Sequence, residues 1–286
     1  FVAGTIDQNT REYLLSHNYP LASSGFSFVN FRELNYPVTV EEILRNASSW
    51  NTDFTGFRFP FTKPTFYGII TLEGHGYKYE SSIAANNLDF IQGAVIPYNI
   101  VVSREGFYKG TDILEIAPTY HDDYYFLGSL DKAQGADSNY LGKNVRVYSE
   151  YLKDFWQYAV KPYNGLMVFL GHPRYAGYND ATLSALSDLI SEVKKDRAWI
   201  ASLDQVAEFR NGLCTMEFYS EPVTNGFKIG ITAPDGTRVQ GVCLNVAGRV
   251  KSASARQGKA KVINSGSGSQ IIFEAFNGQT VNVSME

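Results

Sequence analysis

His172 occupies the position in this 286-residue chain that most favours proton-transfer chemistry. It follows the apolar run 166–170 after one glycine, and such a run is typical of a strand covered on both faces. Folds of the α/β class place their active sites just past the carboxyl ends of buried parallel strands. An imidazole also titrates near neutral pH. Two interpretations stay open: a general acid or base, and a histidine that caps a turn.

A second candidate is the polar and aromatic cluster 120–125, which contains His121, Asp122, Asp123 and Tyr125. Adjacent carboxylates beside a histidine can bind a metal, orient a base or contact the hydroxyls of a sugar. Tyrosine rings suit the apolar faces of sugar rings. The alternative interpretation is a solvated turn that has no function.

Arg58 is the third candidate, because it stands between Phe57 and the pair Phe59-Pro60. A guanidinium among apolar side chains needs a carboxylate or a ligand, since burying an unpaired charge is costly. We therefore expect Arg58 to have such a partner. The alternative is a surface arginine on an edge strand.

The first 210 residues alternate between short apolar runs and helical patterns. The predicted strands are residues 1–4, 21–28, 54–61, 166–170 and 198–201. The predicted helices are residues 10–18, a helix opened by a capping box from Thr39 to Glu42, a helix after Asn179, and residues 202–210. This alternation predicts a parallel sheet or barrel with helices outside.

Residues 212–286 have a different character, and we predict that they form a separate domain after residues 1–210. Residues 227–231 alternate with period two, and turn sequences occur at 234–236 and at 277–278, the latter typical of a tight hairpin. These features predict a small all-β sandwich. Carbohydrate binding and a plain packing role both stay open for it.

Composition excludes several classes of function. The net charge is −4, so the chain has no basic surplus for a nucleic-acid backbone. Apolar residues make up 44%, but no apolar run approaches the roughly 20 residues of a membrane span. No phosphate loop, serine-nucleophile elbow or zinc-helix motif occurs. Cys214 and Cys243 are too few for a cysteine metal site, and either pair or lie buried as small apolar residues.

Five segments follow one another in an order found in one protein family. They are Gly-Phe-Arg-Phe-Pro-Phe at 56–61, Gly-Tyr-Lys-Tyr-Glu-Ser-Ser at 76–82, Leu-Glu-Ile-Ala-Pro with Asp-Asp at 114–123, the run ending in His-Pro at 167–173, and residues 198–209. In this order they resemble motifs of the polysaccharide deacetylases, the NodB-homology carbohydrate esterases, in their allantoinase- and peptidoglycan-deacetylase-like branch. The resemblance covers about residues 1–210.

This resemblance implies a fold, a reaction and roles for two residues. The fold is a distorted (β/α)7 deacetylase-type barrel, followed here by the small all-β sandwich. Family members remove acetyl groups with a divalent metal, commonly zinc, held by one Asp and two His. His172 matches the family's catalytic acid, and Arg58 matches the arginine that orients the base. The implied partner is a carbohydrate or peptidoglycan-like polymer, and the implied location is extracellular or periplasmic.

Two departures from the family pattern bear on activity. The segment at Phe1 resembles the family's second strand, so the first strand, with base and metal ligand, is expected upstream of it. Ser24 and Phe28 stand where the two metal-binding histidines belong. A phenylalanine cannot bind zinc, and a serine hydroxyl is a poor substitute for imidazole. We therefore expect the usual His-His-Asp site to be absent from this chain.

Three hypotheses follow. In the first, the protein hydrolyses N- or O-acetyl groups on a carbohydrate, with His172 and Arg58 as catalytic residues. In the second, it is a catalytically silent carbohydrate-binding protein on the same scaffold. In the third, it is a structural or assembly protein. The expected substrate contacts are His121, Asp122, Asp123, Tyr125, Phe59 and Pro60.

Overall fold

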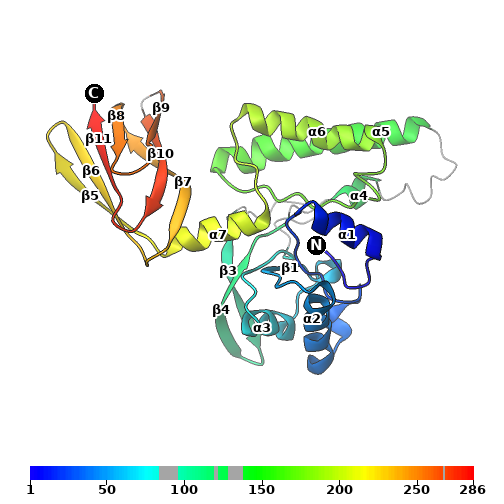
Figure 1. Ribbon diagram of the computed structural model, residues 1–286. Helices are drawn as coiled ribbons and strands as arrows, with labels where there is room; N and C mark the ends of the chain where they lie inside the picture. The colour runs from blue at the N-terminus through cyan, green and yellow to red at the C-terminus, as the bar shows by residue number, and fades with distance from the viewer. Residues whose placement is uncertain (84–95, 119–121, 128–137, 267) are drawn as a thin grey trace. The chain divides into compact units, whose positions relative to one another are not determined.

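The computed structural model describes residues 1–286 except 84–95, 119–121, 128–137 and 267, and gives only the backbone of 138–143. The chain divides into two units, Phe1–Asp204 and Gln205–Glu286 (Figure 1). The division falls inside helix α7 (Leu203–Cys214), whereas the sequence pattern changes near residues 210–212. The helix continues past that point although it contains a glycine.

The first unit contains a mixed sheet with strand order β1-β2-β4-β3. Its strands are β1 (Gly56–Phe57), β2 (Tyr79–Glu80), β3 (Tyr98–Arg104) and β4 (Phe107–Glu115). Strands β1, β2 and β4 are parallel, and β3 pairs with β4 as an antiparallel hairpin. Single parallel bridges extend the sheet from Phe57 to Ser23 and from Ser23 to Val2. Five chain segments therefore run side by side in one direction.

Helices pack around this sheet and beside it (Figure 1). They are α1 (Gln8–Ser16), α2 (Tyr36–Trp50), α3 (Phe66–Gly74), α4 (Asp123–Leu127), α5 (Ser138–Asp154) and α6 (Asp180–Lys195). Shorter helical segments are η1 (Phe31–Glu33), η2 (Pro60–Thr62), the π-helix η4 (Phe155–Val160) and η5 (Lys161–Tyr163). The arrangement is a mixed α/β fold, as the alternating sequence pattern predicts.

Helix α6 begins where the sequence predicts, but helix α2 does not. The Asn179 side chain accepts from the Thr182 N–H at 3.0 Å and caps α6. The predicted capping box at Thr39 is wrong, because Asn35 caps α2 earlier by accepting from the Val38 N–H at 3.1 Å. Thr39 is instead buried inside the helix, where its hydroxyl donates to the Asn35 carbonyl at 2.9 Å.

The predicted strand 166–170 is not a strand in the described residues. Within this run only Val168 is buried. Met167 and Phe169 pack against the core formed by α4, α5 and α6, including Tyr148 and Leu189. The apolar run therefore reflects packing onto helices, and no neighbouring strand pairs with it. Residues 198–201 likewise form no described strand.

The second unit is all-β after α7. Its strands are β5 (Glu217–Val223), β6 (Gly226–Thr232), β7 (Arg238–Ala247), β8 (Val250–Ala255), β9 (Lys261–Ser265), β10 (Gly268–Phe276) and β11 (Thr280–Met285). They form one sheet of order β7-β10-β9 and one of order β5-β6-β11-β8. A single core contains residues of both sheets, among them Ile231, Ile271 and Val281.

Two expectations for this unit need correction. The turn at residues 277–278 joins β10 to β11, which lie in different sheets, so it does not close a hairpin. The two sheets cover opposite faces of the shared core, and the chain passes from one sheet to the other at this turn. Cys214 and Cys243 are neither paired nor buried; both are free and exposed.

In the described part of the chain, no helix is both long and apolar enough to span a bilayer.

Close packing between β1 and β2 generates a stability prediction. A Cβ at Gly56 would lie 2.0 Å from the Tyr79 ring, which is itself buried. We expect Gly56→Ala to destabilise the fold by about 1–3 kcal/mol, because the ring cannot move without disturbing the core. Urea unfolding measures this. Gly74→Ala is the control, since a Cβ there meets no atom within 4 Å; equal losses in both variants would contradict the packing argument.

Candidate functional site

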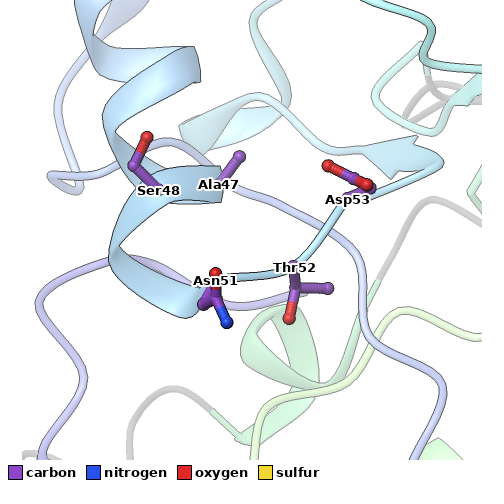
Figure 2. A pocket seen from close by; sticks show the side chains of 5 residues that line it. All are labelled: Ala47, Ser48, Asn51, Thr52 and Asp53. Carbon is purple, nitrogen blue, oxygen red and sulfur yellow. The ribbon is translucent and has the colours of Figure 1, made fainter.

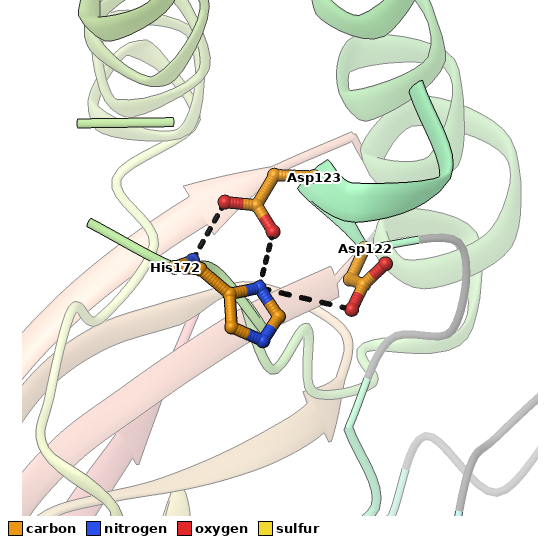
Figure 3. A group of neighbouring side chains, drawn as sticks. All are labelled: Asp122, Asp123 and His172. Atoms are coloured by element: carbon orange, nitrogen blue, oxygen red, sulfur yellow. Dashed lines mark hydrogen bonds and ion pairs between the residues drawn. The ribbon is translucent and has the colours of Figure 1, made fainter. Parts of the chain in front are cut away.

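The site is built around a contact between His172 and the buried Asp123. The Nδ1 atom of His172 lies 2.7 Å from Oδ1 of Asp123, and the backbone N–H of His172 donates to Oδ2 at 2.6 Å (Figure 3). The backbone N–H of Ala176 donates to the same Oδ2 at 3.0 Å. Asp123 has no exposed surface, so these donors satisfy a carboxylate that water does not reach.

This contact sets the tautomer of the imidazole and influences its pKa. An ionised carboxylate only accepts hydrogen bonds, so Nδ1 carries the proton and donates it to Asp123. The His172 side chain is 45% exposed. The hydrogen bond that His172 donates to Asp123 raises the pKa of His172, while burial and the charge of Arg58 act in the opposite direction. The result is an imidazole held by one nitrogen and free to exchange a proton at Nε2.

Asp122 is the other carboxylate of the cluster and differs from Asp123 in its surroundings. Its Oδ2 lies 3.9 Å from Nδ1 of His172, and its Oδ1 accepts from the Tyr125 N–H at 3.2 Å. Partial burial raises its pKa, and the Tyr125 N–H and the His172 charge lower it. Asp122 therefore keeps an accessible carboxylate beside the imidazole, whereas the oxygens of Asp123 are fully engaged.

The metal that the family resemblance implies does not fit these residues. Ligand atoms of Asp122, Asp123 and His172 lie within 4.8 Å of one another, a separation that a metal ion could span. Both oxygens of Asp123, however, already accept N–H donors, and Nδ1 of His172 already donates. The Ser24 hydroxyl donates to the Arg58 carbonyl at 2.9 Å, and the ring of Phe28 packs on Phe61 at a centroid distance of 4.7 Å. We assign no reaction step to a metal.

Arg58 follows β1 and binds the segment after β2. Its Nε donates to the Ser81 carbonyl at 2.6 Å and its Nη2 to the Ser81 hydroxyl at 2.7 Å. The guanidinium lies 4.2 Å from the ring centre of Phe1. In the described structure no carboxylate oxygen lies within 4.0 Å of it, so the expected direct partner is replaced by Ser81 and more distant charges. Burial lowers its pKa to about 10, and the charges of Glu80 and Glu115 counteract this.

Arg58 and His172 lie within electrostatic reach of the same carboxylate. The charge of Asp122 raises the pKa of Arg58 and that of His172. Arg58 in turn lowers the pKa of His172. The sequence suggested these residues separately, and the fold brings them to one region of the first unit.

Three other substrate contacts expected from the sequence are Phe59, Pro60 and His121. Phe59 is fully buried, and its ring packs edge-on against Phe31 and Phe57. Pro60 is buried too. Neither presents a surface to a substrate, because the aromatic core needs both; the exposed residue of this segment is Phe61. His121 lies outside the described residues.

Tyr125 is 61% exposed beside Asp122, so its ring is accessible at the edge of the cluster. The buried glutamates Glu80 and Glu115 fall within the segments 76–82 and 114–123, but no local pattern in the sequence shows that they are buried. A shallow pocket of about 240 Å³ elsewhere, at the end of α2, shares no residue with the cluster (Figure 2). It is lined by Ala47, Ser48, Asn51, Thr52 and Asp53.

Comparisons with known proteins identify the fold. No protein-family model and no curated protein sequence matches the chain. A solved structure named as a polysaccharide deacetylase from Mycobacterium smegmatis matches with a TM-score of 0.55 and 18% identity, covering 73% of this chain and 69% of that one. The chain has a polysaccharide deacetylase fold.

A second polysaccharide deacetylase structure, from Pseudomonas aeruginosa PAO1, matches with a TM-score of 0.52 and 18% identity. The match covers 70% of this chain and 61% of that chain. At this identity the two neighbours establish the deacetylase fold alone. The chemistry of this deacetylase-fold chain must be argued from its own residues.

The Asp123 contact generates a pH prediction. We expect Asp123→Asn to lower the pKa of His172, because the variant loses the anion that stabilises the imidazolium. A raised folded-state pKa means that the pair stabilises the protein below the ordinary imidazole pKa of about 6.5. That contribution is lost as the pH rises through the folded-state pKa.

Titration of the His172 ring signals by NMR measures the pKa directly. Asp188→Asn is the matched control, since Asp188 pairs with Lys153 on the surface. An unchanged His172 pKa in the Asp123 variant would show that the carboxylate does not act on the imidazole.

Proposed function

We propose that the chain hydrolyses N- or O-acetyl groups on a carbohydrate, with His172 as the general acid. The observation that carries the proposal is the contact between His172 and Asp123: a buried carboxylate binds Nδ1 of a side chain that is 45% exposed, and Nε2 points away from that carboxylate (Figure 3). The two structural neighbours, named as polysaccharide deacetylases, support the substrate class.

The proposed reaction uses four side chains. Water adds to the acetyl carbonyl, the C–N or C–O bond breaks, and acetate leaves. The Nε2 proton of His172 passes to the leaving nitrogen or oxygen, and Asp123 stabilises the imidazolium before that transfer. The proton of the attacking water passes to the accessible carboxylate of Asp122. Arg58 supplies a positive charge near the developing negative charge on the carbonyl oxygen.

Silent carbohydrate binding is the second candidate, and a specific observation favours it. Ser24 is engaged with the Arg58 backbone and Phe28 with Phe61, so neither position offers a metal ligand. Exposed rings remain beside Asp122, at Tyr124 and Tyr125. A binding protein needs such rings and hydrogen-bonding groups but no proton donor.

The finer architecture belongs to the same proposal. We propose that the parallel segments of the first unit complete a distorted (β/α)7 barrel, in support of which five of them run in one direction. We propose a sandwich for the second unit, because its two sheets share one core. The second unit then acts as an accessory domain.

Acetate release from acetylated chito-oligosaccharides tests the function. We expect His172→Ala to reduce the rate at least about 100-fold, the usual contribution of a general acid. His17→Ala is the control, since His17 lies at the end of α1 and its Nδ1 contacts Tyr13 and Ser16 of the same helix. A wild-type protein that binds the oligosaccharide but releases no acetate would establish the silent candidate instead.

A further inference from the structure

Two buried glutamates lie beside Arg58 and take no part in the proposed reaction. Glu80 ends β2 and Glu115 ends β4, and the two residues are direct partners in the parallel register. Neither has exposed surface. Two ionised carboxylates in one water-free place repel each other strongly, so the pair is expected to hold a proton.

The hydrogen-bonding pattern supports a shared proton, because most oxygens of the two carboxyls receive no N–H or O–H donor at ordinary geometry from the described residues. Oε1 of Glu115 accepts from the Ile83 N–H at 3.1 Å, while Oε2 has no partner among the described residues. Neither oxygen of Glu80 accepts a hydrogen bond of ordinary geometry from the described residues. Burial raises the pKa of Glu115 to about 12, and the charge of Glu80 adds to this effect. Burial raises the pKa of Glu80 as well, so the two carboxyls form one coupled pair that is expected to hold a single proton between them.

Arg58 explains why one negative charge is retained there. Its guanidinium contacts Ser81, the residue next to Glu80, through two hydrogen bonds. The Ser81 hydroxyl donates in turn to the Ile116 carbonyl, next to Glu115, at 2.7 Å. Arg58 is thus bonded directly to the residue that follows Glu80 and is linked through Ser81 to the residue that follows Glu115. A cation withdrawn from water needs a nearby anion.

We propose that Glu80 and Glu115 share one proton and act together as the single-charge counter-ion that keeps Arg58 positively charged and in place. The two glutamates are positioning residues, since neither has surface to touch a substrate. The inference rests on the proposed function for its catalytic meaning, but its tests do not require turnover.

Replacement by glutamine separates this arrangement from its alternatives. Glutamine mimics the protonated member, so Glu80→Gln and Glu115→Gln each keep one negative charge, and each is expected to change Tm by a few degrees only. The double variant leaves Arg58 without its anion, and we expect Tm to fall by roughly ten degrees or more. Adding Arg58→Met to the double variant should recover much of that loss.

Proton linkage gives a second, independent readout. An unfolded glutamate is ionised at neutral pH, so unfolding should release about one proton from the wild-type pair and none from either single variant. Since the folded protein binds the extra proton, wild-type stability should fall more steeply between pH 6 and 8 than that of Glu115→Gln. The pH dependence of Tm, together with calorimetry in two buffers, measures this release.

One neighbouring group titrates in this interval: burial lowers the pKa of the Phe1 amino group to about 6, and because this group is present in every variant, comparison between variants removes its contribution. Arg58 and Tyr98 face the pair, and their pKa values of about 10 and about 12 lie outside the interval. Burial raises the pKa of Tyr79, which therefore stays protonated. Asp122 and His172 act on Arg58 from further away and are present in every variant, so their contribution cancels.

Each outcome decides the proposal. If the decrease in Tm of the double variant equals the sum of the decreases in the two single variants, the counter-ion proposal is wrong. The same holds if Arg58→Met recovers none of the Tm lost in the double variant. Single variants that are more stable than wild type would indicate that both glutamates are ionised in the folded wild type. Equal proton release on unfolding from wild type and from the single variants would exclude a shared proton. Glu105→Gln, an exposed glutamate in the β3–β4 turn, is the control for loss of a charge. Failure of acetate release alone would affect the proposed function and leave these results standing.

Discussion

The contact between Asp123 and His172 is the interaction on which the site depends. A carboxylate without access to water must have its oxygens satisfied by the protein, and here three N–H groups of the segment 172–176 do so. The start of α4 is thereby joined to a segment about fifty positions later. Because the imidazole supplies one of the donors, the requirement that buries Asp123 also sets the orientation of His172.

The parallel sheet places the opposite charges of the site. Strands β1, β2 and β4 run in one direction, so Arg58, Glu80 and Glu115 collect at their carboxyl ends. Arg58 lowers the pKa of His172, and Asp123 raises it. The pKa of the imidazole therefore depends on two opposing charges: the cation Arg58, which follows strand β1, and the anion Asp123, which begins helix α4. Its pKa cannot be attributed to its nearest neighbour alone.

The sequence indicated which candidate residues the fold brings together better than it indicated the elements that carry them. His172 was singled out because it follows an apolar run, yet that run packs on helices and is not a strand. Asn179 identified its helix because a side-chain cap is a local interaction. The box at Thr39 failed because Asn35 competes for the same helix start. No local pattern showed the burial of Glu80, since that burial depends on Glu115, thirty-five positions away.

Loss of the imidazole ligands changes what the remaining residues must do. Ser24 and Phe28 are used for packing and backbone contacts, so in the proposed reaction stabilisation of the carbonyl oxygen falls to Arg58. Arg58 keeps a pKa of about 10 despite burial, well above neutral pH, and this depends on the anions around it. Its charge therefore persists wherever His172 titrates. In the reaction that we propose, that cation faces the developing negative charge, so the buried glutamates that keep it charged matter to the proposed chemistry together with the exposed histidine.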